Sequence, residues 1–166
     1  MPTIINPDDS EYKNDPSALE QFDLLTLSPR LSKIVDSKHF VFDLRKLHSG
    51  KYSFPYHYHH NAEELIMIIS GSMTVRTSKG FEIVKKDQVV FFEMGETGVH
   101  QFYNHCAEPC IYLDIRSTVG IDVCEYPDSG KIKVTQINEV FEKQSHVDYN
   151  KGEENVQIIW DKLKNE

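Results

Sequence analysis

The central part of the chain is built from short runs of β-branched and aromatic residues. Turn-forming residues separate these runs every eight to twelve positions, a spacing typical of all-β sandwiches and barrels. No helix-length apolar pattern lies between them, so a parallel α/β sheet is not expected. The runs predict nine strands, at residues 40–44, 56–59, 64–69, 73–77, 81–84, 88–92, 100–103, 110–115 and 131–137.

The first 39 residues are polar and contain four prolines, so we expect an arm without long regular elements. Within this arm, Pro16 suits the first turn of a short helix, and Asp15 could be its N-cap. Leu19, Phe22 and Leu24 would form the apolar side of this helix.

The end of the chain is mostly polar until Val156, Ile159, Trp160 and Leu163, which recur at helical spacing. They predict one short amphipathic helix, which packs Trp160 either on the barrel of its own chain or on a second copy of the chain. The chain therefore divides, within one structural domain, into an N-terminal arm, a barrel and a C-terminal extension. These parts cover residues 1–39, 40–137 and 138–166.

Composition places the chain among ordinary single-domain globular proteins. Of its 166 residues, 39% are hydrophobic and 27% are charged, which resembles neither a disordered tail nor a membrane protein. The formal net charge of −8 argues against nucleic acids or anionic lipid surfaces as partners. The longest apolar run, 65–69, is too short to span a bilayer. No secretory signal is recognised at the N-terminus, so a cytoplasmic location is expected.

The three cysteines, Cys106, Cys110 and Cys124, are an odd number, which favours reduced thiols over a disulfide framework. No Cys-x-x-Cys pair is present, so a structural zinc ribbon is not expected.

Three histidines within four residues are the first candidates for chemistry. Period-two alternation puts His57 and His59 on one face of a strand and His60 on the other. Glu64 opens the next predicted strand, and a tight turn would bring its carboxylate beside the two imidazoles. His100 begins a further predicted strand. Two imidazoles and a carboxylate on one face bind a divalent transition metal and leave open positions, and a third imidazole would complete a four-ligand site.

The stretch 50–71 resembles the first sequence motif of the cupin superfamily, in which a glycine, a His-x-His pair, a glutamate and a second glycine follow in order. Here these positions hold Gly50, His57, His59, Glu64 and Gly71. Glu64 fits the motif better than Glu63, because six residues separate it from Gly71. The spacer between Gly50 and His57 is six residues where the motif has five, which affects a loop and no ligand position.

The stretch 87–104 resembles the second cupin motif, with a single histidine, His100, and Asn104 four positions on. Lys86 stands where the motif has glycine, no proline precedes Gly95, and the loop to His100 is longer than usual. The resemblance implies a small jelly-roll barrel, also called a double-stranded β-helix. It also implies one divalent transition metal (iron, manganese, nickel or zinc), bound by His57, His59, Glu64 and His100.

After the barrel, the residues Tyr126-Pro-Asp-Ser-Gly-Lys131 resemble a signature of one subgroup of single-domain bacterial cupins, of the cupin type 2 kind. Pro-Asp-Ser-Gly is also ordinary turn chemistry. The resemblance covers about residues 40–153. Ile66 and Phe102 share strand faces with ligand positions, so they are candidate pocket walls, although core packing explains them equally well.

Three functions follow as expectations. The first is a metal-dependent enzyme that acts on a small polar molecule by isomerisation or oxygenation, with the metal as Lewis acid and no separate catalytic base identified. The second is a non-catalytic cupin that binds or senses a sugar-like ligand. The third is a homodimeric accessory domain with a structural metal, in which arm and tail are exchanged. The resemblance implies a homodimer in each case.

Overall fold

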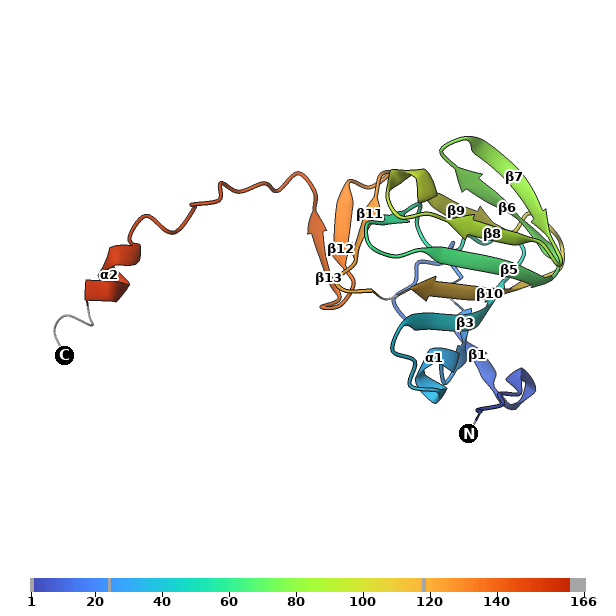
Figure 1. Ribbon diagram of the computed structural model, residues 1–166. Helices are drawn as coiled ribbons and strands as arrows, with labels where there is room; N and C mark the ends of the chain where they lie inside the picture. Colours follow the sequence, from blue (N-terminus) through green and yellow to red (C-terminus); the bar gives the residue numbers. More distant parts are fainter. Residues whose placement is uncertain (1, 24, 118, 162–166) are drawn as a thin grey trace.

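Antiparallel strands dominate the computed structural model, which describes residues 2–23, 25–117 and 119–161. Two sheets face each other across the barrel (Figure 1). The larger sheet has the strand order β1 (Glu11–Lys13), β2 (Leu25–Ser28), β3 (Phe40–Leu47), β10 (Cys110–Ser117), β5 (Glu64–Ser70) and β8 (Val89–Phe92). The smaller sheet has the order β7 (Gly80–Lys85), β6 (Ser72–Thr77) and β9 (His100–Tyr103).

A third sheet lies at one end of the barrel (Figure 1). Its order is β13 (Glu139–Glu142), β12 (Lys131–Val134), β11 (Val123–Tyr126) and β4 (Tyr58–His59). The register pairs Cys124 of β11 with His59 of β4. This sheet therefore brings the strand that follows the barrel next to the His-x-His segment.

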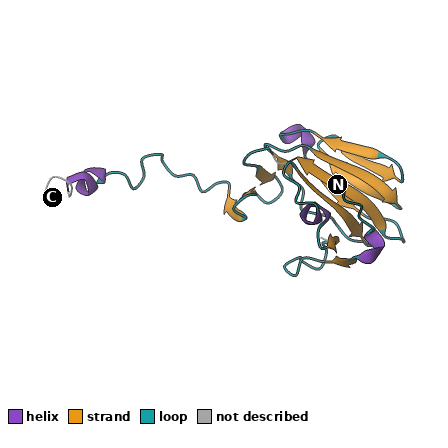
Figure 2. Cartoon of the chain, turned by 60° about the horizontal axis from the view of Figure 1, so that its bottom comes forward, coloured by secondary structure: helices purple, strands orange, loops and turns teal. Residues whose placement is uncertain are grey.

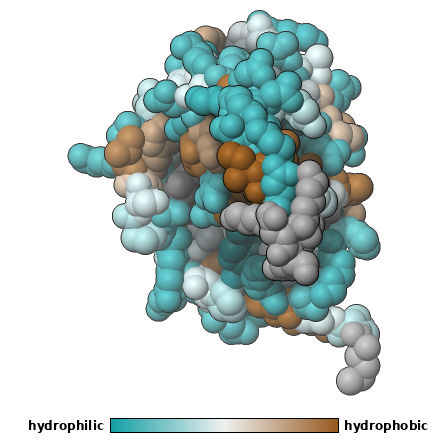
Figure 3. Space-filling view, turned by 90° about the vertical axis from the view of Figure 1, so that its left-hand side faces the viewer, coloured by the Kyte–Doolittle hydropathy of each residue, from teal (hydrophilic) through white to brown (hydrophobic). Residues whose placement is uncertain are grey.

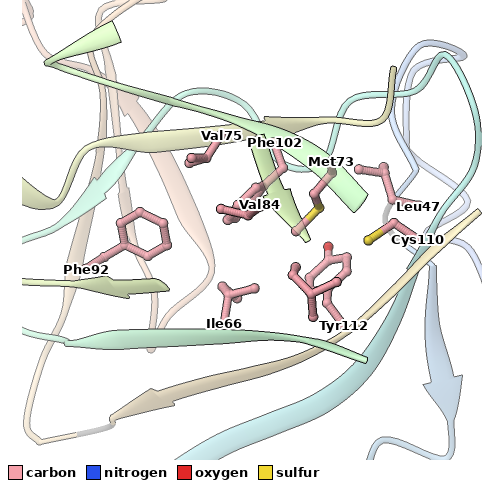
Figure 4. Close-up of a cluster of buried hydrophobic side chains, with 10 residues drawn as sticks. Leu47, Ile66, Met73, Val75, Val84, Phe92, Phe102, Cys110 and Tyr112 are labelled. Carbon is pink, nitrogen blue, oxygen red and sulfur yellow. The ribbon is translucent and has the colours of Figure 1, made fainter. Parts of the chain in front are cut away.

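The hydrophobic core fills the space between the two facing sheets (Figure 4). It forms because alternate residues of each strand point inward, which gives β5 and β10 one buried and one outward face. The core cluster consists of Leu47, Ile66, Ile68, Met73, Val75, Val84, Phe92, Phe102, Cys110 and Tyr112. All three cysteines are free thiols, as predicted.

All nine predicted strands are found, the one at 100–103 with its predicted ends and the others with altered ends. The last of them is shorter than predicted, because β12 ends at Val134 and a turn with Asn138 at a φ of 56° leads into β13. Strands β1, β2, β11 and β13 were not predicted. Of these, β13 is exposed along its whole length, so it has no alternating apolar pattern to reveal it.

The arm contributes more structure than predicted, but not the expected helix. After a short 3₁₀ turn, η1 (Pro7–Asp9), it adds β1 and β2 to the six-stranded sheet and then forms the short helix α1 (Leu31–Ile34). The predicted helix from Pro16 is wrong: Asp15 accepts hydrogen bonds from Ser17 and shapes a turn. Phe22 instead forms a bridge with Tyr52, and Leu24 lies outside the described residues.

The C-terminal extension leaves the barrel as an extended segment and ends in α2 (Val156–Asp161) (Figure 2). The prediction that Trp160 packs on the barrel of its own chain is wrong, because this side chain is 64% exposed and α2 has no buried residue. In the view from that end of the molecule, patches of hydrophobic surface (brown) lie among larger hydrophilic areas (teal) (Figure 3). Leu163 lies outside the described residues. No helix within the described ranges is long and apolar enough to cross a membrane.

The turn between β5 and β6 depends on the absence of a side chain at Gly71. Its φ is +78°, and an added Cβ would lie 2.9 Å from the carbonyl oxygen of Pro109. Gly50 has a similar φ of +72° with nothing within 4 Å of the added Cβ. We predict that Gly50→Ala loses about 1–2 kcal/mol of unfolding free energy from the left-handed backbone alone. Gly71→Ala should lose about 1–3 kcal/mol more of unfolding free energy than Gly50→Ala, because the backbone at Pro109 must move away from the new Cβ.

Urea unfolding of both variants measures these losses. Equal losses at the two positions would show that the contact with Pro109 relaxes without cost.

Candidate metal centre

The structure brings the four predicted ligands together from three strands and a bridge. His57 forms an isolated bridge with His100, the first residue of β9, while His59 ends β4 and Glu64 begins β5. All four side chains are buried. Oε2 of Glu64 lies 3.6 Å from Nε2 of His59 and 3.4 Å from Nε2 of His100, and the His57 and His100 rings are 4.8 Å apart.

Each of the three imidazoles is held by its Nδ1, which leaves Nε2 for the centre. For His57 and His100 the partner is a backbone carbonyl, which can only accept, so Nδ1 carries the proton and Nε2 has a free lone pair. A partner on the second ring nitrogen is the usual arrangement of metal-binding histidines. The distances are 2.8 Å from His57 to Pro55 O, 2.6 Å from His59 to Asp122 Oδ2 and 2.8 Å from His100 to Gly98 O.

Burial favours the neutral form of the His57 and His100 imidazoles. It lowers the pKa of His57 well below its usual range, helped by the neighbouring histidines, and it lowers the pKa of His100 to about 4. Burial also raises the pKa of Glu64 well above its usual range, and the charge of Asp114 acts in the same direction. Neutral imidazole is the form that coordinates metals, and a buried carboxylate requires a compensating positive charge.

The donor atoms fit a transition metal by chemistry and by spacing. Oε2 of Glu64 is buried and has no hydrogen-bond partner among the described residues, and it faces the lone pairs of the imidazoles. Donors bound to one tetrahedral ion at about 2.1 Å lie about 3.4 Å from one another. The two separations from Glu64, 3.4 and 3.6 Å, agree with this value.

Strand β11 also contributes to the site, which the sequence motifs did not predict. Asp122, which lies just before this strand, accepts the hydrogen bond from His59, and the Tyr126 ring stacks on His57 at 5.8 Å. Cys124 Sγ lies 3.6 Å from His59 Nε2, and burial raises the pKa of this thiol to about 12. The alternation of 122, 124 and 126 before the turn is the signal that could have indicated one shared face.

The possible donors form two overlapping groups within the described part of the chain. One consists of His57, Glu64 and His100, and the other consists of His57, His59 and Cys124. His57 is common to both. The site thus has one thiol at its margin in addition to the predicted nitrogen and oxygen donors.

A cavity of about 300 Å³ opens over this centre. His57, His59 and Glu64 are among its lining residues, as are Arg116 and Lys133, whereas His100 is not. This volume is at the lower end of the range for small-molecule pockets, which suits a compact ligand. Three of the four predicted ligands therefore face a space that a small molecule can enter.

The other residues singled out in the sequence lie away from this cavity. Ile66 and Phe102 belong to the hydrophobic core and are not among the residues that line the cavity, although the Phe102 ring is 5.7 Å from that of His100. His60 points to the opposite side of its strand, where its side chain is 48% exposed and lies 3.2 Å from Glu125.

Residues 44–116 match the family model of the cupin domain. This match and the barrel agree with the resemblance found in the sequence, and the chain has the cupin fold. No curated protein matches the chain.

Solved structures share this fold at low sequence identity. A sugar phosphate isomerase of the cupin superfamily from Silicibacter pomeroyi is 18% identical, with a TM-score of 0.74 over 89% of this chain and 98% of that chain. A candidate sugar phosphate isomerase from Acidithiobacillus ferrooxidans is 23% identical, with a TM-score of 0.67 over 75% and 81%. The polyketide cyclase RemF from Streptomyces resistomycificus is 21% identical, with a TM-score of 0.55 over 70% and 80%.

The hydrogen bond from His59 to Asp122 gives a test of the second layer of the site. We predict that Asp122→Asn lowers metal affinity about 10–100-fold, because the amide cannot orient and polarise the imidazole as the carboxylate does. Asp36→Asn, which removes an exposed carboxylate paired with Lys38 in the arm, should leave metal affinity within about 2-fold. Competition with a chromophoric chelator measures both affinities. Equal losses in both variants would contradict a specific role for Asp122.

Proposed function

We propose that this chain is a metal-dependent enzyme that acts on a small polar molecule, of the single-domain cupin subgroup that the residues after the barrel resemble. In this proposal, His57, His59, Glu64 and His100 hold one divalent transition metal, which is iron, manganese, nickel or zinc. The observation that carries the proposal is the cluster of imidazole lone pairs around the unpartnered Oε2 of Glu64. Such a cluster of buried acceptors without a donor is stabilised by a cation.

The bound ion would act as a Lewis acid that polarises a carbonyl or hydroxyl oxygen of the ligand, as isomerases and oxygenases of this type require. The chain supplies orientation, because Asp122 and two backbone carbonyls fix the imidazole rings. The cavity supplies a space of about 300 Å³ for a compact ligand. Isomerisation is the first reaction class to test, because two of the solved structures with this fold are named for sugar phosphate isomerase activity.

The cavity over the donor set favours an exchangeable site over a purely structural one, because structural metals are closed off by four protein ligands. A sensor or carrier that binds a sugar-like molecule without turnover is the second candidate function. The same cavity supports it. Thermal stabilisation by a small molecule without product formation would identify the binding protein, and turnover would identify the enzyme.

Elemental analysis of protein purified without chelator and without added metal tests the proposed site. We expect about one transition metal ion per chain. His57→Ala and His100→Ala should lose most of this metal, because each removes an imidazole whose Nε2 faces the centre. His60→Ala should retain it, because His60 lies on the other face of the strand.

Equal metal loss in all three variants, or a chain without metal, would contradict this assignment. If the metal is present, retention of its full amount in His57→Ala would contradict it as well.

We propose further that the chain forms a homodimer through the outer face of the six-stranded sheet. The arm covers the β3 side of this face, where Leu27 and Leu31 pack against Leu44. The β5 and β8 side stays uncovered and apolar. Its exposed side chains are Met67, Ile69, Val89 and Phe91, which are between 36% and 55% exposed.

Two copies related by a twofold axis would bury this surface against itself. Light scattering should give twice the chain mass of 19.2 kDa for the wild type. The double variant Val89→Asp, Phe91→Asp should elute as a monomer, because it places charges in the centre of the contact. Phe81→Asp, which changes an exposed aromatic residue on β7 of the smaller sheet, should remain dimeric. A wild-type monomer would contradict the proposal.

A further inference from the structure

Two basic side chains line the cavity over the metal centre from different sheets. Arg116 lies on β10, where the register pairs it with Glu64. Lys133 lies on β12, where the register pairs it with Cys124, the neighbour of His59. Each of the two basic residues therefore lies directly across from a residue at the candidate centre, Glu64 or Cys124.

Among the described residues, neither side chain makes a hydrogen bond to a carboxylate, and Arg116 forms one long ion pair, with Asp122. The nearest carboxylate oxygen to Arg116 is Oδ2 of Asp122, 4.0 Å from its guanidinium, and the Arg116 side chain is only 21% exposed. The carboxylate of Asp122 already accepts hydrogen bonds from His59, Asn61 and Thr135. Within the described part of the chain, the Lys133 ammonium makes no hydrogen bond or ion pair, and its charge acts on the exposed carboxylate of Asp15 in the arm.

The other two cations of the cavity differ in this respect. Arg30 is paired with Asp43, and Arg45 is paired with the buried Asp114. Arg116 and Lys133 are thus the two lining cations without a carboxylate within hydrogen-bond distance among the described residues.

A half-buried cation that lacks a hydrogen-bonded carboxylate is costly unless another anion can reach it. A guanidinium presents several donors in one plane, which matches the oxygens of a phosphate or a carboxylate, and an ammonium adds a point charge. We infer that Arg116 and Lys133 form an oxyanion-binding subsite beside the metal centre, so that the small molecule carries a phosphate or a carboxylate group. That the ligand is a small molecule bound at the metal centre rests on the proposed function. That it carries an anionic group rests on Arg116 and Lys133.

The subsite is tested by thermal unfolding of the full chain with inorganic phosphate and, in a second arm, with acetate. Sodium chloride at equal ionic strength controls for screening. Both arms are run on metal-loaded and on chelator-treated protein. At ten times the dissociation constant, the better anion should raise the Tm of the wild type by about 3–6 °C. A larger effect of phosphate than of acetate assigns a phosphorylated ligand, and the reverse assigns a carboxylate.

Substitutions locate the binding. Arg116→Gln should weaken anion binding about 10–100-fold, because it removes a charge-assisted hydrogen-bonding group, and Lys133→Gln should weaken it about 3–10-fold. Lys79→Gln makes the same change of charge at the exposed hairpin between β6 and β7 and should have no effect. The metal content of all three variants should equal that of the wild type. Lys133→Gln carries the test alone if Arg116→Gln does not fold.

Anion binding that is unchanged in Arg116→Gln and Lys133→Gln would overturn the inference, as would a wild type that neither anion stabilises. Either result leaves the proposed metal site intact if the metal content is about one ion per chain. Conversely, a wild type without metal that still binds phosphate through Arg116 overturns the proposed function and retains the subsite.

Discussion

Two reciprocal backbone hydrogen bonds between His57 and His100 are the constraint on which the candidate centre depends. The amide of His57 donates to the carbonyl of His100 at 3.1 Å, and the amide of His100 donates to the carbonyl of His57 at 2.9 Å. They bring two imidazoles from distant parts of the sequence together at one end of the barrel. A slip of one residue in this pairing would turn one of these side chains away from the site. Main-chain geometry thus sets the position of the donors, and side-chain contacts set only their rotation.

The same arrangement creates an electrostatic demand that the protein alone does not meet. Neutral imidazoles direct lone pairs toward Glu64, whose Oε2 has no donor in the described structure. Burial makes each of these groups more costly than it would be in water. Burying these polar groups lowers the free energy of unfolding, and the hydrophobic core between the sheets offsets this loss. A bound cation would raise the free energy of unfolding again. Folding and metal binding are therefore expected to be coupled in this chain.

Much of the fold and the four-residue set could be predicted from the sequence, because both depend on local periodicity and on the cupin motifs. Strands with one buried face, such as β5 and β10, show their alternation directly. The contribution of Cys124 could not be predicted, because it depends on the pairing of β11 with β4, and a strand's own pattern does not name its partner. The failed helix after Pro16 has a similar cause: Phe22 finds a partner in Tyr52, and this tertiary contact overrides a weak helical pattern.

The hairpin of β11 and β12 explains why a stretch with ordinary turn chemistry bears on the site. Its turn is tied to the smaller sheet, because Asp128 accepts two hydrogen bonds from Arg76 at 2.6 and 3.0 Å. The guanidinium of Arg76 also lies 3.7 Å from the centre of the Tyr56 ring. With the turn held in this way, the strand before it presents Tyr126 to His57, and the strand after it forms a wall of the cavity. An exposed ion pair contributes little to stability, yet here it fixes the element that shapes the site.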